Sequence, residues 1–224
     1  MLCRKSIPSA LAALAAAILI VGCGGGSESS EPSVPFEPQA SLRAIGGTVR
    51  TDKPQFVMRV KARPGDANIR SAAITLPPAV FVDQAAIVNL CSKRELKADD
   101  CAGRKRMGFA RILSPAYGGA LTGPVYAVSG FGGLPRLVYV LGGPAKVLLY
   151  GRIVTKGERI QAGVDNVPDT SLKTFELRID GGKPGYLVIS RNICRTKTTA
   201  DASFTSQDGE TYAQRIPLKA SCGA

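Results

Sequence analysis

The chain has 224 residues, and its 29 Lys and Arg against 17 Asp and Glu give a net charge of +12. It contains no His and no Trp. Without His it lacks the commonest general base and the commonest metal ligand, which excludes Ser-His catalysis and histidine metal centres. The positive charge favours partners that carry negative charge.

The first 22 residues have the pattern of an export signal. Arg4 and Lys5 precede an apolar run over residues 10–21, and I-V-G-C ends it at Cys23. The run is shorter than the roughly 20 residues that a membrane-spanning helix needs. This pattern resembles a bacterial lipoprotein precursor. The resemblance implies a signal peptide over 1–22, cleavage before Cys23 and lipidation of that cysteine, which would anchor the exported protein to a membrane on its extracytoplasmic side. An ordinary secretory signal with an incidental cysteine is the alternative.

A Gly/Ser-rich and then Pro-spaced segment follows the predicted lipid site. We interpret 23–40 as the lipidated cysteine with a flexible linker and 41–224 as a single domain. This domain has 27 basic and 14 acidic residues, a charge of +13. In an envelope compartment, such a charge predicts contact with phospholipid headgroups, teichoic-type polymers, acidic polysaccharide or extracellular DNA, without sequence-specific nucleic-acid recognition. The alternative is a basic surface that only keeps the protein soluble.

The domain has the periodicity of β-strands almost throughout. Residues 56–62 alternate, with Phe56, Met58 and Val60 on one side and Arg59 and Lys61 on the other. Further strands are predicted at 72–77, 107–113, 122–128, 136–141, 146–154, 159–164, 175–179, 186–190, 202–206 and 212–218.

Gly and Pro punctuate many of the gaps between these segments, which is typical of antiparallel sheets. The predicted fold class is all-β, an antiparallel Ig-like sandwich or a partly open barrel. One short helix is expected near 83–90, where Asp83 can cap it.

Four cysteines remain beyond the leader and the lipid site. For an exported chain they predict two disulfides, with three possible connectivities. We favour Cys91 with Cys101 and Cys194 with Cys222, because the first pair flanks a short segment and the second ties together the last hairpin region. A zinc site of four thiolates is a weaker interpretation because the pairs lack the two-residue spacing of metal knuckles. A redox pair is weaker again, since there is no C-x-x-C.

Basic residues surround the first cysteine pair. The candidate polyanion-binding residues are Lys93, Arg94, Lys97, Arg104, Lys105, Arg106 and Arg111. The alternative is that they form only a solvated rim around a disulfide loop.

The sequence predicts no catalytic residue, cofactor or metal site. The alternative is an envelope hydrolase acting on glycan or ester bonds, which without His would need a carboxylate pair such as Asp165 with Asp169 or Glu176. Asp165, Asn166 and Asp169 could also supply oxygen ligands to calcium, although a polar turn explains them equally well.

Several motifs in the domain resemble repeat modules of large exported proteins from high-GC Gram-positive bacteria. These are I-T-L-P-P-A-V from Ile74, V-P-D-T-S-L from Val167, G-G-K-P-G from Gly181 and R-N-I-C ending at Cys194. The resemblance implies a β-rich extracellular module with a structural or adhesive role and no catalytic residues to transfer. We therefore expect a lipid-anchored, non-catalytic surface protein that binds an anionic envelope polymer or a protein partner. The sequence predicts no oligomeric state.

Overall fold

The computed structural model of the chain describes residues 34–131, 135–183 and 185–222. The predicted signal peptide over 1–22 and the predicted lipid site Cys23 lie outside the described residues. In the described ranges, no helix is long and apolar enough to cross a membrane.

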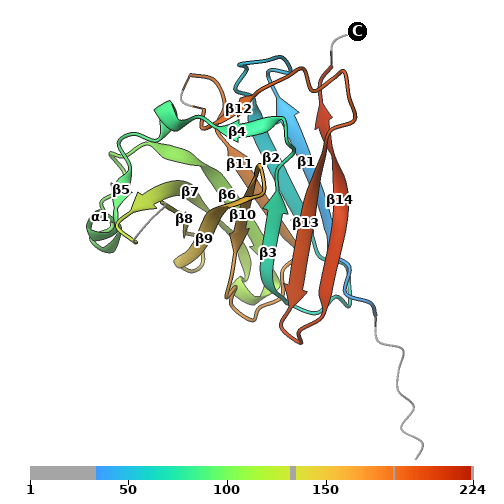
Figure 1. Cartoon of the computed structure of the whole chain (residues 1–224). Coiled ribbons are helices and arrows are strands. Elements are labelled where there is room, and N and C mark those ends of the chain that lie inside the picture. The colour runs from blue at the N-terminus through green and yellow to red at the C-terminus, as the bar shows by residue number, and fades with distance from the viewer. Residues whose placement is uncertain (1–33, 132–134, 184, 223–224) are drawn as a thin grey trace, which may run out of the picture. The chain divides into compact units, whose positions relative to one another are not determined.

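Fourteen strands account for most of the described residues (Figure 1). They are β1 (Gln39–Ile45), β2 (Gln55–Lys61), β3 (Ile69–Thr75), β4 (Val80–Val82), β5 (Cys91–Ser92), β6 (Arg106–Ser114), β7 (Gly119–Ser129), β8 (Arg136–Leu141), β9 (Val147–Lys156), β10 (Arg159–Val164), β11 (Thr174–Ile179), β12 (Leu187–Ile189), β13 (Thr199–Ser206) and β14 (Thr211–Ala220).

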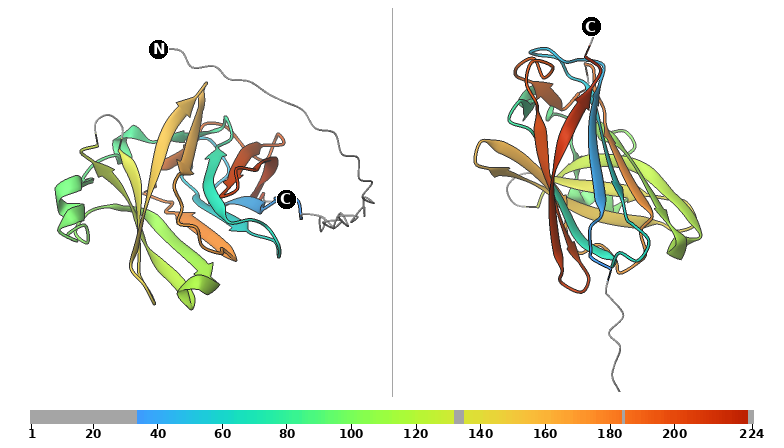
Figure 2. Two further views of the ribbon diagram at one scale, coloured as in Figure 1. Left: turned by 90° about the horizontal axis from the view of Figure 1, so that it is seen from below. Right: turned by 90° about the vertical axis from the view of Figure 1, so that its right-hand side faces the viewer.

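Eleven of these strands form one continuous ring. They pair in the order β7-β6-β11-β2-β1-β14-β13-β3-β10-β9-β8, and β8 pairs with β7 to close the circle. All neighbours in the ring are antiparallel except β1 and β14, which run parallel. In Figure 2 the strands of the β7–β8 region run across the direction of β1 and β14. The all-β prediction is confirmed, in its barrel form.

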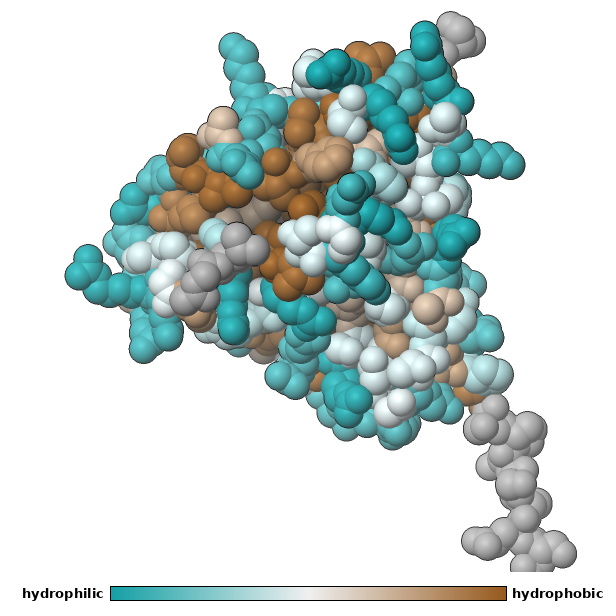
Figure 3. Space-filling model, viewed as in Figure 1, coloured by the Kyte–Doolittle hydropathy of each residue, from teal (hydrophilic) through white to brown (hydrophobic). Residues whose placement is uncertain are grey.

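Three strands lie outside the ring. β5 pairs in parallel with the end of β7, and β4 pairs with β12 in a separate two-stranded sheet at the upper end of the ring in Figure 1. The face shown in Figure 3 is largely hydrophilic, with a hydrophobic area below β4.

The main hydrophobic core lies inside the ring. On β2, Phe56 and Val60 are buried while Arg59 and Lys61 are exposed, as the alternation predicts. The fold begins earlier than our predicted linker boundary, because Phe36 and Pro38 are buried and β1 starts at Gln39.

The helical elements are short. The helix expected near 83–90 is a single 3-10 turn, η1 (Gln84–Ala86), in which the Asp83 side chain accepts a hydrogen bond of 3.0 Å from the Ala85 amide. It stops there because Ile87 has ψ 63° and Asn89 adopts a left-handed conformation with φ 54°. A second 3-10 turn, η2 (Pro115–Tyr117), joins β6 to β7, and the single α-helix is α1 (Lys93–Lys97).

Candidate polyanion-binding surface

Both predicted disulfides are present. Cys91 pairs with Cys101 at a Cα–Cα distance of 5.5 Å, and Cys194 pairs with Cys222 at 5.7 Å. Disulfides persist in oxidising compartments, so this pairing indicates an extracytoplasmic environment.

The segment between Cys91 and Cys101, which we call the stapled excursion, lies on the outer face of the ring. Its Cys91, Leu96 and Cys101 form a second hydrophobic cluster with side chains of β7 and β8, namely Tyr126, Val128 and Val138. The residues that alternate with these on the two strands belong to the main core inside the ring. Both faces of β7 and β8 are therefore buried, which explains why these segments are almost uniformly apolar in the sequence.

The helix of the stapled excursion is fixed by a capping box. The Glu95 amide donates to Ser92 Oγ at 3.1 Å, and the Ser92 amide donates to Glu95 Oε2 at 2.8 Å. The S-K-R-E pattern that carries this box is visible in the sequence, although we did not predict a helix there.

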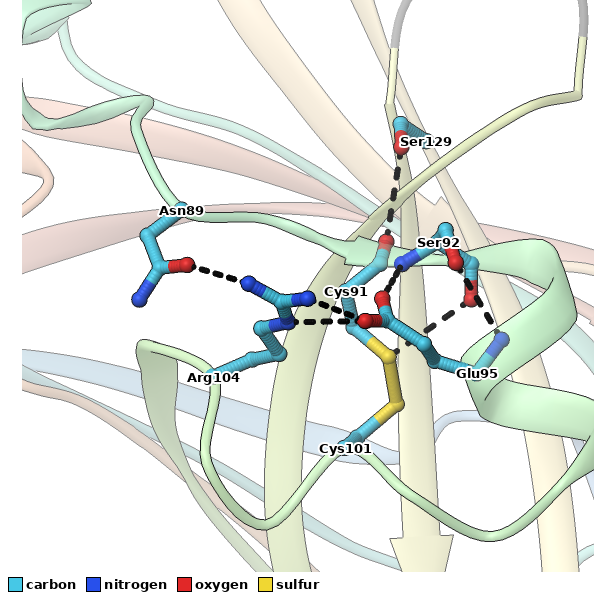
Figure 4. The surroundings of a disulfide bond; sticks show 7 residues. All are labelled: Asn89, Cys91, Ser92, Glu95, Cys101, Arg104 and Ser129. Carbon is cyan, nitrogen blue, oxygen red and sulfur yellow. Dashed lines mark hydrogen bonds and ion pairs between the residues drawn. A yellow bond between two sulfur atoms is a disulfide. The ribbon is translucent and has the colours of Figure 1, made fainter.

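Arg104, which follows Cys101 in the chain, contacts the same Glu95 side chain (Figure 4). Its guanidinium forms an ion pair with Glu95 Oε1, with Nε at 3.0 Å, and donates to Asn89 Oδ1 at 2.7 Å. The hydrogen bond from Arg104, followed by those from Ser92, lowers the pKa of Glu95 to about 2. Arg104 therefore has a structural role.

The next two basic residues also have internal partners. Lys105 Nζ donates to the Ala86 carbonyl at 3.0 Å and lies 4.6 Å from the centre of the Tyr186 ring. Arg106 Nε lies 3.1 Å from Asp180 Oδ2. The side chains of Arg104, Lys105 and Arg106 thus bind other residues of the fold, which leaves them less free to bind an external polyanion.

The three cations of α1 are different. Lys93, Arg94 and Lys97 are exposed, and none of them forms an ion pair with an acidic side chain of the described residues. Because α1 has only five residues, these side chains project from one small area.

Two residues that the sequence did not single out join this area. Lys93 Nζ lies 5.2 Å from the centre of the Phe131 ring, and Arg136 Cζ lies 5.1 Å from the same ring. Phe131 in turn packs edge to face on Tyr150 of β9, with ring centres 6.2 Å apart. We call Lys93, Arg94, Lys97 and Arg136 the cationic cluster. The approach of Lys93 and Arg136 to Phe131 depends on contacts between distant segments, which no local pattern reveals.

The remaining predicted residue, Arg111, lies apart from this cluster. It is exposed on β6 opposite Thr122, whereas the stapled excursion packs on Tyr126 and Val128 of the same neighbouring strand. Six residues of β-strand separate Thr122 from Val128, about 20 Å at ~3.3 Å per residue. The structure therefore does not bring Arg111 together with α1.

The outer face beside the cationic cluster has an apolar character. The strand register places Tyr126, Val138 and Tyr150 in one row across β7, β8 and β9. In this part of the sheet, Leu148 is 39% exposed and Tyr150 is 42% exposed. A bound polymer would thus meet cations beside aromatic and aliphatic side chains.

The candidate carboxylates each have partners of their own. Asp165 forms an ion pair with Arg152, and Asp169 accepts a hydrogen bond of 2.8 Å from Asn68. Glu176 forms ion pairs with Arg59 and Arg178. The hydrogen bond from Arg59, followed by the one from Arg178, lowers the pKa of Glu176. A general acid near neutral pH needs the opposite shift.

The residues considered above as possible calcium ligands lie in the connection between β10 and β11. Asn166 has φ 53°, a left-handed conformation that suits a polar turn between strands. Within residues 34–131, 135–183 and 185–222, no three His, Cys, Asp or Glu side chains are grouped so that they could hold a metal ion.

Comparison with known proteins gives no relative for this chain. No protein-family model matches it, and neither a curated protein nor a solved structure matches it.

Proposed function

We propose that this protein is a lipid-anchored, non-catalytic protein of the cell envelope that binds an anionic polymer through the cationic cluster. The observation that carries the proposal is the contrast between two groups of neighbouring basic residues. Arg104, Lys105 and Arg106 bind partners within the fold, whereas the cations of α1 and Arg136 have no ion-pair partner among the described acidic residues.

The electrostatics of the domain support this role. Its net charge attracts polyanions over a distance of several ångströms at physiological salt, and unpaired cations can then form direct contacts. The stapled excursion holds α1 by a disulfide and a capping box, so little conformational freedom is lost when a ligand binds. Anchoring at Cys23 and the similarity to exported repeat modules are part of the same proposal.

The test is retention on an immobilised sulfated polysaccharide, dextran sulfate, with the mature protein in mild detergent. The variant Lys93→Ser, Arg94→Ser, Lys97→Ser, Arg136→Ser should elute at clearly lower salt. The slope of log affinity against log salt should become shallower by up to about four, one for each cation that no longer pairs with the polymer.

A matched control removes the same charge elsewhere. Arg191→Ser, Arg195→Ser, Lys197→Ser and Lys219→Ser remove four exposed cations that form no ion pair with a described residue. This variant should elute near the unmodified protein. An equal loss of retention in both variants would show that net charge alone, and not the cationic cluster, governs binding.

A further inference from the structure

The inside of the ring contains a cavity of about 90 Å³ whose walls are almost wholly apolar. Side chains from β1, β2, β3, β6 to β11 and β13 line it, so it belongs to the ring as a whole and not to one strand pair. Apolar cavities with a few polar groups are the usual form of small-molecule sites in proteins.

The number of strands accounts for the space. A ring of eight strands encloses an interior that side chains can just fill, and a ring of eleven encloses more. No helix among the described residues runs through this ring. Small residues on the inner face leave this space open, where larger side chains would fill it. The small residues that line the cavity include Ala40, Ala72, Ala162, Gly163 and Ala202.

The cavity is accessible from one end of the ring. Tyr117, Val147, Pro168 and Thr170 line it and are only partly buried or are exposed. They come from η2, from the start of β9 and from the connection between β10 and β11. That connection is held by hydrogen bonds from the Ser114 hydroxyl to the Ser171 carbonyl and from the Val167 amide to the Arg70 carbonyl.

Few polar side chains line this apolar space, and Tyr139 is one of them. Tyr139 lines the cavity and is 3% exposed, and its hydroxyl makes no hydrogen bond with a described residue. Every fully enclosed side-chain N or O atom among the described residues has a partner, so the Tyr139 hydroxyl opens to the cavity. Its ring is held in place by edge-to-face contact with Phe175, at a centre distance of 6.0 Å.

We infer that this cavity is a binding site for a small aliphatic molecule that carries a single hydrogen-bonding group. The hydrocarbon part contacts the apolar walls, and the polar group exchanges a hydrogen bond with the Tyr139 hydroxyl. A hydroxyl that opens to an apolar cavity and has no hydrogen-bond partner among the described residues favours a ligand that supplies one. This site is independent of the cationic cluster, which lies on the outside of the ring.

The experiment uses straight-chain alcohols of four to eight carbons as probes, with binding followed by chemical-shift changes of the cavity-lining methyl groups. The unmodified protein should show saturable shifts. Tyr139→Phe, which removes only the hydroxyl, should weaken alcohol binding about tenfold while leaving binding of the matching alkane unchanged. Tyr150→Phe removes an exposed tyrosine hydroxyl on the outer face and should change neither affinity.

A second variant fills the cavity. Ala162→Leu should abolish saturable binding of every probe, and Ala40→Val serves the same purpose if the larger side chain prevents folding. The cationic-cluster variant should bind the alcohols normally, which separates this inference from the proposed function. Absence of saturable shifts in the unmodified protein, or equal affinities in the protein and in both cavity-filling variants, would overturn the assignment.

Discussion

The Arg104 guanidinium donates hydrogen bonds to Glu95 of α1 and to Asn89, which precedes β5. Glu95 accepts the hydrogen bond from Arg104 on Oε1 and the one from the Ser92 amide on Oε2. A single carboxylate therefore joins the helix cap to the segment after Cys101. A helix of five residues is too short to be stable alone in water. These bonds, together with the disulfide, are what keep α1 helical.

Glu95 should make the stapled excursion sensitive to acid. Its pKa is lowered from 4.5 to about 2 in the folded protein, so its contribution is fully present above about pH 4.5. The contribution is lost as the pH falls toward 2. For Glu95→Gln, we expect lower thermal stability than the unmodified protein at pH 7 and a gap that narrows toward pH 2, measured by thermal melts across this range.

The control for this effect is Glu158→Gln, at the tip of the hairpin between β9 and β10, where no ion pair with a described residue is present. Its stability profile should follow that of the unmodified protein. A gap for Glu95→Gln that stays constant from pH 7 to pH 2 would contradict a role for the ionised carboxylate.

Gly123 of β7 lies against the backbone of β8, the strand with which β7 closes the ring. A Cβ atom added to Gly123 would lie 1.8 Å from the Val140 carbonyl oxygen, so even alanine forces the two strands apart. Gly123→Ala should lower the free energy of unfolding by about 1–3 kcal/mol, the usual cost of overpacking. Urea denaturation measures this loss.

Gly142 supplies the comparison, since it forms a bridge with Thr122 beside the same site. An added Cβ there meets nothing within 4 Å, and Gly142→Ala should change stability little. Similar losses of stability for the two substitutions would contradict the clash with the Val140 carbonyl as the reason that position 123 requires glycine.

Local sequence patterns predicted where most of the strands lie in the chain, but not which strands pair with one another. The alternation in residues 56–62 places β2 correctly, because one face of that strand is buried and the other is in water. β1 was missed, since Q-A-S-L-R-A-I follows a Pro-spaced segment that has the composition of a linker. Its partner in the parallel pair is β14, at the opposite end of the chain, and no local signal reports such a pairing.

The candidate site was predicted to a similar extent. The even number of cysteines in an exported chain predicted two disulfides, and the positions of the cysteines along the chain favoured the pairing that the structure has. The density of Lys and Arg marked the stapled excursion. Which of these cations bind internal partners depends on Asn89, Glu95 and Asp180, which only the fold brings into contact. The cavity was not predicted, because its existence depends on how many strands the ring contains.

Across the molecule, the two disulfides hold different parts of the structure. Cys91–Cys101 closes a segment that lies outside the ring and contains α1. Cys194–Cys222 closes a segment that contains β13 and β14, two adjacent strands of the ring. In a closed ring each strand has a neighbour on both sides, so β13 and β14 cannot open without breaking pairs on β3 and β1.

This difference predicts two distinct responses to loss of a disulfide. By chain entropy the two bonds contribute about 3 and 3.5 kcal/mol. With Cys91→Ser and Cys101→Ser, we expect the stapled excursion to open locally, so amide hydrogens of α1 exchange fast while those of the ring remain protected. With Cys194→Ser and Cys222→Ser, protection should fall around the whole ring, because the strands that become less constrained are part of it. Hydrogen exchange followed by mass spectrometry distinguishes the two patterns. Uniform loss of protection in the first variant would contradict a separate outer cluster, since it would mean that α1 and the ring unfold as one unit.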